Sequence, residues 1–218
     1  MLKNPKNPNR RMRRTAALAV VTALSLAGLA ACGNGSSGSS NGSNAGSATT
    51  TGGGVDPNAP EESPPGDIPD DQVFVPYQFP DGSFTVKVPE GWSRTEDAGT
   101  VTFTDKFNSI ALSTTPASAA PTVASAERDE VPAIASAVGN YEAGTVETVT
   151  RSAGDAVRIT YRADSPPDAV TGSSTTLDVE RYELFDGSNE IVLVLSGPKG
   201  ADNVDPWKLV TDSVRFGP

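Results

Sequence analysis

Short runs in which apolar and polar residues alternate recur from about Val73 onward, and each predicts a β-strand with one buried face. The clearest run is Phe84-Thr85-Val86-Lys87-Val88, in which Phe84, Val86 and Val88 share a face. Turn-forming triplets mark its ends, Pro-Asp-Gly before it and Pro-Glu-Gly after it. By the same pattern we expect further strands at residues 101–104, 109–114, 146–151, 156–161 and 175–185.

One strand departs from this alternation. Residues 191–195 read Ile-Val-Leu-Val-Leu, so both of its faces are apolar. A strand of that kind lies in the middle of a sheet that is covered on both sides. Residues 186–189, Asp-Gly-Ser-Asn, are turn formers and predict a hairpin that leads into it.

Two segments have helical character. Residues 122–138 are rich in alanine and carry charges in the middle, which predicts a helix. Pro132 lacks the amide donor of a helix interior, so it should kink this helix or split it in two. Asp205 and Pro206 supply an N-cap and a proline at the first helical position, which predicts a second helix over residues 206–212. The fold class is therefore α+β, a mostly antiparallel β-sheet flanked by helices and preceded by a disordered linker.

The first 31 residues form an export signal. Residues 1–14 are basic, and the uncharged apolar stretch that follows is too short to span a bilayer comfortably. It ends in Leu29-Ala30-Ala31-Cys32, which resembles the lipobox of bacterial lipoproteins in full. The resemblance implies that diacylglycerol is attached to the Cys32 thiol and that the chain is cleaved between Ala31 and Cys32. Two alternatives stay open, an ordinary signal peptide with an accidental cysteine and an uncleaved anchor.

The export route is also open. Arg13-Arg14 is compatible with twin-arginine export, but the residues after it lack the aromatic and lysine of that signal, and basic pairs are common in Sec signals. In either case the mature protein is expected at the extracytoplasmic face of the cell membrane, held there by the lipid on Cys32.

A tether follows the lipidated cysteine. Residues 33–54 consist of small and polar residues without a charge, and they cannot bury enough surface to fold. Residues 55–71 are acidic and rich in proline, so they should be stiffer and more extended. The expected organisation is a signal peptide over residues 1–31, a tether over 32–71 and an α+β domain over 72–218.

The charge excludes one class of partner. Six of the 17 basic residues precede residue 15 and no acidic residue precedes Asp56, so 11 basic residues face 27 acidic ones in the mature chain, a net charge of −16. Nucleic-acid binding needs clusters of Lys and Arg, which the mature sequence lacks. An acidic surface also disfavours attraction to anionic headgroups, so membrane contact is expected through the acyl chains on Cys32.

The residue types present also limit the chemistry. The chain has no histidine and one cysteine, so His-based triads, His-ligated zinc and intramolecular disulfides are excluded. We therefore expect no cofactor, no metal and no catalytic residue of these kinds.

Four segments carry a resemblance to a known family: FTVKVPEGW at 84–92, GDAVRITY at 154–161, LDVERYELFDG at 177–187 and LSGPKGADNVDPWKLVTDSVRF at 195–216. They resemble actinobacterial LpqN-like lipoproteins, which are similar to the PsbP-like fold, an antiparallel sheet between helices. The resemblance covers the domain but not the linker, and it rests on scaffold motifs such as the Pro-x-Gly-Trp turn. It implies a binding or assembly accessory and carries no catalytic motif onto this chain.

Three groups of residues are candidates for a site. Trp92 and Trp207 would line a binding groove in one interpretation and fill the core in the other. Asp202, Asn203 and Asp205 offer oxygen ligands for calcium, but helix capping accounts for the same residues.

The third group is charged. Asp178 and Glu180 share one face of a predicted strand, and Arg158 and Arg162 share a face of another. Paired carboxylates are capable of acid–base catalysis, whereas cross-strand ion pairs are the ordinary role of such residues.

Two functions of different classes remain open. One is a non-enzymatic binding or accessory module of the cell envelope, whose partner is a protein, a glycan or a lipid. The other is a hydrolase or transferase acting on envelope material through Asp178 or Glu180. A cleft of ~300 Å³ or more with converging carboxylates would favour the enzyme, and a flat polar sheet face would favour the module.

Overall fold

The structure is a computed structural model that describes residues 66–168 and 170–217. The expected signal peptide, the lipobox-like motif with Ala31 and Cys32, and the expected tether up to residue 65 lie outside the described residues. The helices of the described part are all too short or too polar to cross a bilayer.

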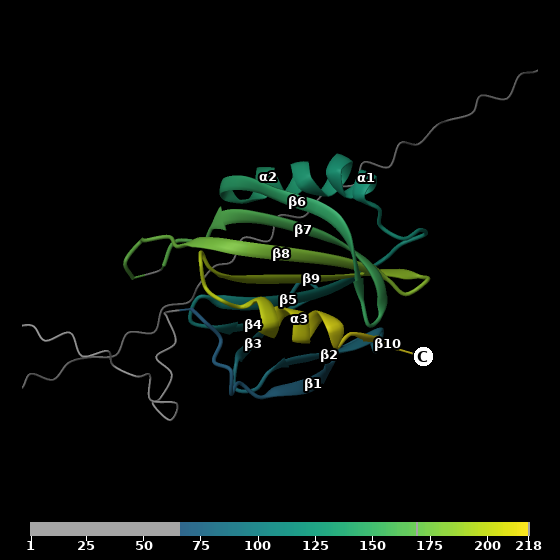
Figure 1. Cartoon of the computed structure of the whole chain (residues 1–218), viewed down its shortest axis with the longest axis horizontal. Coiled ribbons are helices and arrows are strands. Elements are labelled where there is room, and N and C mark those ends of the chain that lie inside the picture. Colours follow the sequence, from purple (N-terminus) through teal and green to yellow (C-terminus); the bar gives the residue numbers. More distant parts are fainter. Residues whose placement is uncertain (1–65, 169, 218) are drawn as a thin grey trace, which may run out of the picture. The chain divides into compact units, whose positions relative to one another are not determined.

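The described residues form a seven-stranded antiparallel sheet in the order β3-β4-β5-β9-β8-β7-β6 (Figure 1). Its strands are β3 (Ser93–Asp97), β4 (Thr100–Asp105), β5 (Asn108–Pro116), β6 (Gly139–Arg151), β7 (Gly154–Asp164), β8 (Thr176–Phe185) and β9 (Asn189–Pro198). A three-stranded sheet in the order β1-β2-β10 consists of β1 (Phe74–Gln78), β2 (Phe84–Pro89) and β10 (Arg215–Phe216). The helices are α1 (Val123–Ser125), η1 (Ala126–Glu130), α2 (Val131–Ala137) and α3 (Val204–Asp212).

The large sheet is covered on both faces. The small sheet and α3 lie against one face and enclose the main core, which includes Phe84, Leu112, Leu193 and Val210. The helical segment α1-η1-α2 covers part of the other face, where Ala126 packs on Val157 and Ile159. The expected α+β class, a mostly antiparallel sheet with helices, is confirmed.

Strand β9 has the position that its sequence predicts. It lies in the middle of the seven strands, between β5 and β8. Leu193 and Leu195 point into the main core and are fully buried, while Val192 is buried on the opposite face. Its apolar character on both parities therefore reflects burial on both faces.

Several strands differ in extent from the expectation. Strand β3 was not predicted, because all five of its side chains are exposed and leave no alternating pattern. Strand β10 has two residues, which is too short for any periodicity. Strand β6 begins at Gly139 rather than near residue 146, because its first half carries two register shifts that break the alternation.

The predicted helix at 122–138 is a single helical segment with a π-helical turn in its middle. Thr122 caps it: its hydroxyl accepts from the Ser125 N–H, and the Ser125 hydroxyl accepts from the Thr122 N–H. The π-turn, Ala126–Glu130, comes just before Pro132, and the Val131 N–H bonds to the Ala126 carbonyl. The wider turn changes the hydrogen-bond register where the proline has no N–H to donate.

The ordered domain extends further toward the N-terminus than the sequence predicts. Residues 66–71 were assigned to the tether, yet Ile68 is buried in the main core. The Gly66 carbonyl accepts hydrogen bonds from the Asn108 and Asn203 side chains at 2.9 and 3.1 Å. The Ile68 N–H donates to Asn203 Oδ1 at 2.8 Å. A single apolar residue between prolines and acidic residues is too weak a pattern to reveal this attachment.

Asn203 also corrects the expected cap of the second helix. Helix α3 begins at Val204, so Asp205 lies in its first turn instead of at the N-cap. Asn203 holds the N-cap position, but its side chain makes no capping bond and bonds instead to the attached segment and to Asn108.

We expect Asn203→Ala to lower the stability of the domain by roughly 3 kcal/mol. The change leaves the buried Ile68 N–H without its acceptor and Asn108 Oδ1 without its donor, and each orphaned buried group costs about 1–3 kcal/mol. Gln72→Ala is the matched control, because the hydrogen bonds of Gln72 are exposed to solvent. Chemical denaturation of both variants measures the effect. Equal stability of the two variants would show that the attachment adds nothing.

Candidate functional site

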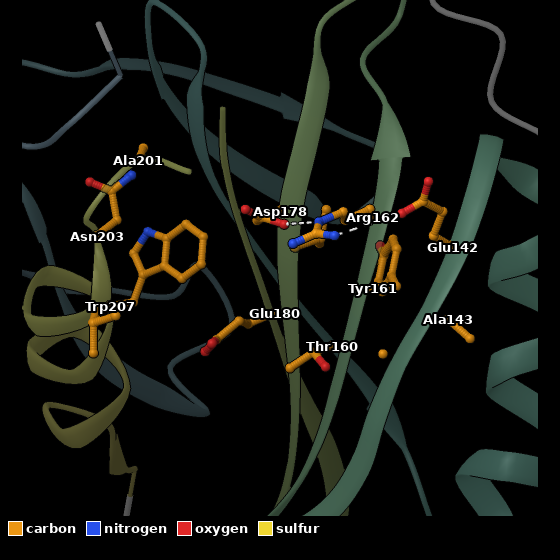
Figure 2. Close-up of a pocket in the computed structure, with 13 residues that line it drawn as sticks. Glu142, Ala143, Thr160, Tyr161, Arg162, Asp178, Glu180, Ala201, Asn203 and Trp207 are labelled. Atoms are coloured by element: carbon orange, nitrogen blue, oxygen red, sulfur yellow. Dashed lines mark hydrogen bonds and ion pairs between the residues drawn. The ribbon is translucent and has the colours of Figure 1, made fainter. Parts of the chain in front are cut away.

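A groove of about 410 Å³ lies between the start of α3 and the strands β6, β7 and β8 (Figure 2). On the helix side it is lined by Ala201, Asn203, Val204 and Trp207. On the sheet side Glu142, Arg162, Asp178 and Glu180 contribute its charged groups. The groove therefore has a largely apolar wall facing a charged wall.

The sheet register assembles the charged wall. Arg162 lies opposite Asp178 in the β7–β8 pair, and its Nε donates to Asp178 Oδ1 at 2.6 Å. The same guanidinium lies 3.8 Å from Glu142. Arg158 contacts Glu147 at 2.5 Å and Glu180 at 3.6 Å. The predicted cross-strand ion pairs between these two strands are thus confirmed.

One carboxylate of the wall, Asp178, is held as a charged group. Desolvation acts to raise the pKa of Asp178, but hydrogen bonds from the Gly200 N–H and from Arg162 outweigh it and lower the pKa below its ordinary value. Glu180 accepts a short hydrogen bond of 2.5 Å from the Tyr182 hydroxyl. A general acid needs a raised pKa, so the environment of Asp178 favours ionic recognition over proton donation.

Glu142 reaches the groove from the edge strand β6, at a point where the pairing of β6 with β7 is irregular. The β6–β7 register shifts between Gly139 and Glu142 and again between Ala143 and Val146. Gly144, between these shifts, lies so close to β7 that a Cβ there would come within 2.5 Å of the Thr160 carbonyl oxygen. Bulges of this kind redirect side chains at sheet edges and near sites. Here they accompany a glutamate at the groove.

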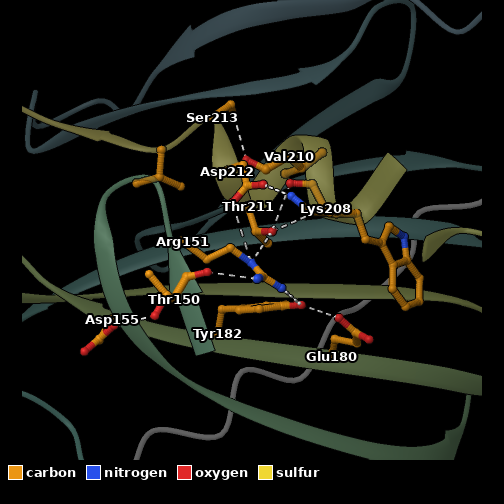
Figure 3. Close-up of polar contacts among 12 residues, drawn as sticks. Thr150, Arg151, Asp155, Glu180, Tyr182, Lys208, Val210, Thr211, Asp212 and Ser213 are labelled. Carbon is orange, nitrogen blue, oxygen red and sulfur yellow. Dashed lines mark hydrogen bonds and ion pairs between the residues drawn. The ribbon is translucent and has the colours of Figure 1, made fainter. Parts of the chain in front are cut away.

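A polar network holds α3 against the sheet and so sets the width of the groove (Figure 3). Arg151, at the end of β6, donates to the Thr211 hydroxyl and to the Tyr182 hydroxyl, both at 3.0 Å. Its guanidinium also lies over the Tyr182 ring, 5.0 Å from the centroid. Because Tyr182 in turn donates to Glu180, the network links the helix to the charged wall.

The two tryptophans contribute mainly to packing. Trp207 belongs to the main core with 8% exposure, although one side of it lines the groove. Trp92 is half-buried and packs against the same core. The core-filling interpretation therefore holds for both, and Trp92 lies outside the groove.

The structure places the three candidate calcium ligands in different settings. Asn203 is engaged as described above, and the Asp202 N–H donates to Asp67 Oδ1 at 2.9 Å. Asp205 lies in the first turn of α3. Within the part of the chain that the structure describes, acidic side chains do not gather into a group suited to a metal ion.

A buried carboxylate lies on the opposite face of the sheet, under the helical segment. Glu183 is 1% exposed and contacts Arg181 at 2.7 Å, while Arg181 reaches Glu130 at 3.1 Å. Burial raises the pKa of Glu183; Arg181 opposes this shift and Glu130 adds to it. This cluster is distant from the groove because neighbouring residues of β8 point to opposite faces.

We expect Glu183→Gln to alter how stability depends on pH. A carboxyl whose pKa is raised in the folded state contributes stability at low pH and loses it as the pH rises through that pKa. The melting temperature of Glu183→Gln minus that of the parent should therefore increase from pH 4.5, the ordinary pKa, toward neutrality. Thermal melts over this range measure it, with the exposed Glu127→Gln as control. A constant difference would contradict the shift.

Sequence reasoning missed three contributors to the site. Arg151 and Tyr182 form the network under α3, and Glu142 extends the charged wall. A basic residue next to the Ser-Ala-Gly turn was the available signal for Arg151, in a mature chain with few basic residues. Glu142 had no comparable signal, because its position depends on the bulges of β6.

Comparisons with known proteins describe the fold. No family model and no curated protein matches the sequence. Among solved structures, the chain is similar to cyanobacterial PsbP (CyanoP) from Synechocystis, with 14% identity and a TM-score of 0.47 over 69% of this chain and 98% of that one. It is similar to the Saccharomyces cerevisiae Ran-binding protein Mog1p, with 10% identity and a TM-score of 0.45 over 66% and 96%.

A Bacteroides thetaiotaomicron protein is similar at 16% identity and a TM-score of 0.45; the match covers 66% of this chain and 48% of that one, so the chain spans about half of its length. At these identities and TM-scores the likeness concerns the course of the backbone alone.

Proposed function

We propose that the chain is a lipoprotein anchored in the cell membrane through Cys32, and that its domain is a non-enzymatic binding or accessory module on the extracytoplasmic face. The lipobox, the tether and the resemblance of four segments to LpqN-like lipoproteins support the proposal. The binding site in this proposal is the groove between α3 and strands β6 to β8. Its partner is a protein, glycan or lipid of the cell envelope.

The main support for a binding role is that the charged groups of the groove wall are already paired with one another. Both oxygens of Asp178 are bonded, one to Arg162 and the other to the Gly200 N–H at 3.0 Å. A wall of paired charges keeps its geometry without a ligand, which suits selective recognition more than proton transfer. The apolar rim opposite, where Val204 is 70% exposed, offers surface that a partner would cover.

One observation favours the alternative, a carboxylate-dependent hydrolase or transferase. The groove exceeds the ~300 Å³ expected of an enzyme site, and Glu142, Asp178 and Glu180 all border it. The lowered pKa of Asp178 makes it unsuited as a general acid, which leaves Glu180 or Glu142 for that role. Each of these already contacts a guanidinium. The binding module accounts for the site with fewer requirements.

Crosslinking from the rim of the groove tests the proposal. A photoreactive amino acid in place of Val204 should give a discrete adduct in intact cells, whereas the same group at Ser188, in the exposed β8–β9 turn, should not. Ala201→Trp, which fills part of the groove, should abolish the adduct while the protein still folds, as judged by its melting curve. An adduct that persists in Ala201→Trp would place the partner elsewhere on the domain.

A further inference from the structure

Three exposed apolar side chains lie at the same end of the large sheet. They are Phe107, Val170 and Val204, which are 52%, 92% and 70% exposed. Phe107 is in the β4–β5 turn, Val170 in the β7–β8 loop and Val204 at the start of α3. Single exposed apolar residues are common, so it is the convergence of these three from distant parts of the sequence that needs an explanation.

The strand register brings the three together. Ser109, just after the β4–β5 turn, pairs with Ser196 near the end of β9. Leu177, just after the β7–β8 loop, pairs with Pro198, from which the chain leads into α3. Phe107 and Pro166 line a common hollow of about 280 Å³ between turn and loop. These segments lie together at the left end of the sheet in Figure 1, and the β8–β9 turn lies at the other end.

The local backbone presents these side chains outward. Asp168 Oδ1 accepts hydrogen bonds from the Val170 and Thr171 N–H groups at 3.0 and 2.7 Å, which fixes the loop below Val170. Lys106 has a φ of 51°, so the β4–β5 turn is tight and leaves Phe107 at its tip.

The described chain begins at this same end. The Gly66 carbonyl is bonded to Asn108 and Asn203, which are the immediate neighbours of Phe107 and Val204 in the sequence. Gly66 itself has a φ of 102°, and a Cβ there would lie 2.4 Å from the Pro198 side chain. The point from which the tether leads back to Cys32 is therefore fixed beside the apolar side chains. We call this part of the domain, residues 66–68, 105–108, 165–168, 170–175 and 198–204, the attachment end.

We propose that the attachment end rests on the lipid bilayer, with Phe107 and Val170 contacting it and the groove-lining Val204 at the margin of the contact; this rests on the proposed anchoring through Cys32. The composition of the 33 residues between Cys32 and Gly66 predicts a flexible tether, and a chain of that kind has an r.m.s. span of about 30 Å. In this proposal the tether keeps the attachment end near the membrane at high effective concentration. A contact too weak to recruit a free protein is then sufficient to orient an anchored one.

The charge of the attachment end defines the kind of contact. Lys106 and Lys199 are outnumbered there by Asp67, Asp105, Asp168 and Asp202. The contact must therefore be apolar, and it should form on phosphatidylcholine and weaken as anionic lipid is added. This dependence is the reverse of that expected for electrostatic docking.

A tryptophan reporter tests the proposal on the full lipidated protein in vesicles. Phe107→Trp keeps an apolar ring at the tip, and Ser188→Trp places the same reporter in the turn at the far end. On phosphatidylcholine with brominated acyl chains, Phe107→Trp should lose several-fold more fluorescence than Ser188→Trp. The native Trp92 and Trp207 give the same background in both. Val170→Asp should reduce the quenching at position 107, whereas Ser188→Asp should not.

Flotation of the vesicles distinguishes a failure of the lipid anchor from a failure of the contact between the attachment end and the bilayer. If the protein floats and Phe107→Trp is quenched no more than Ser188→Trp, the contact with lipid is overturned while the anchor stands. If the protein does not float, the anchor through Cys32 fails and the contact fails with it. Quenching that increases with anionic lipid would also overturn the apolar contact.

Discussion

Replacing Leu193 with aspartate should leave the domain unfolded at room temperature. Leu193 is fully buried in the middle of the central strand β9, between Leu112 of β5 and Tyr182 of β8. The substitution removes the packing of the leucine and buries an unpaired carboxylate. Together these effects lower the free energy of unfolding by on the order of 5 kcal/mol or more. Domains of this size have a total stability of about 5–15 kcal/mol. Circular dichroism and chemical denaturation measure the loss.

Two further variants make this test specific. Val192→Asp should be as damaging, because Val192 is buried on the other face and lies opposite the buried Glu183. Val170→Asp should melt like the parent, since its side chain is 92% exposed. A Leu193→Asp protein with a native melting curve would contradict the central position of β9.

Cys32→Ser should remove the protein from the membrane fraction. Without the thiol no diacylglycerol is attached, so the chain loses the anchor that its lipobox predicts. Cell fractionation and immunoblotting measure the change. We expect almost complete loss of membrane retention, with precursor or released domain appearing instead. Unprocessed Cys32→Ser protein that stays tightly in the membrane would mean that the apolar segment at residues 16–31 is an anchor.

The strands that could be predicted are those whose buried faces produce a regular pattern of apolar residues in the sequence. The alternation in Phe84–Val88 and the uniformly apolar Ile191–Leu195 each reflect how many faces of a strand are covered. The ion pairs between β7 and β8 followed in the same way, because charges two or four residues apart share a strand face.

Elements without such a pattern were not predictable. All side chains of β3 are exposed, so its sequence has no apolar pattern. Its position in the sheet comes from pairing with β4. Residues 66–68 pack through one apolar side chain and through hydrogen bonds to residues more than 40 positions away. Pro132 correctly signalled an irregular helix, but the π-turn that accommodates it depends on the backbone bonds before it.

Several residues of the groove could be named from the sequence, but the groove itself could not. Asp178, Glu180, Arg162 and Trp207 were recognised as candidates, yet their arrangement depends on where α3 lies relative to the sheet. That position depends on the burial of Trp207 and Val210 in the core and on the contacts of Arg151 with Tyr182 and Thr211, which are 31 and 60 residues away in the sequence. Long-range contacts of this kind leave no local periodicity from which a site could be assembled.

The intact mass of the protein extracted from the membrane tests the central claim most directly. We predict a chain of residues 32–218 that begins with Cys32 and carries the added mass of a diacylglycerol on its thiol. Tandem mass spectrometry of the N-terminal peptide would locate the lipid on that residue. A membrane-bound chain that still begins at Met1, or one that begins at Cys32 without a lipid, would contradict the account of a lipid-anchored module.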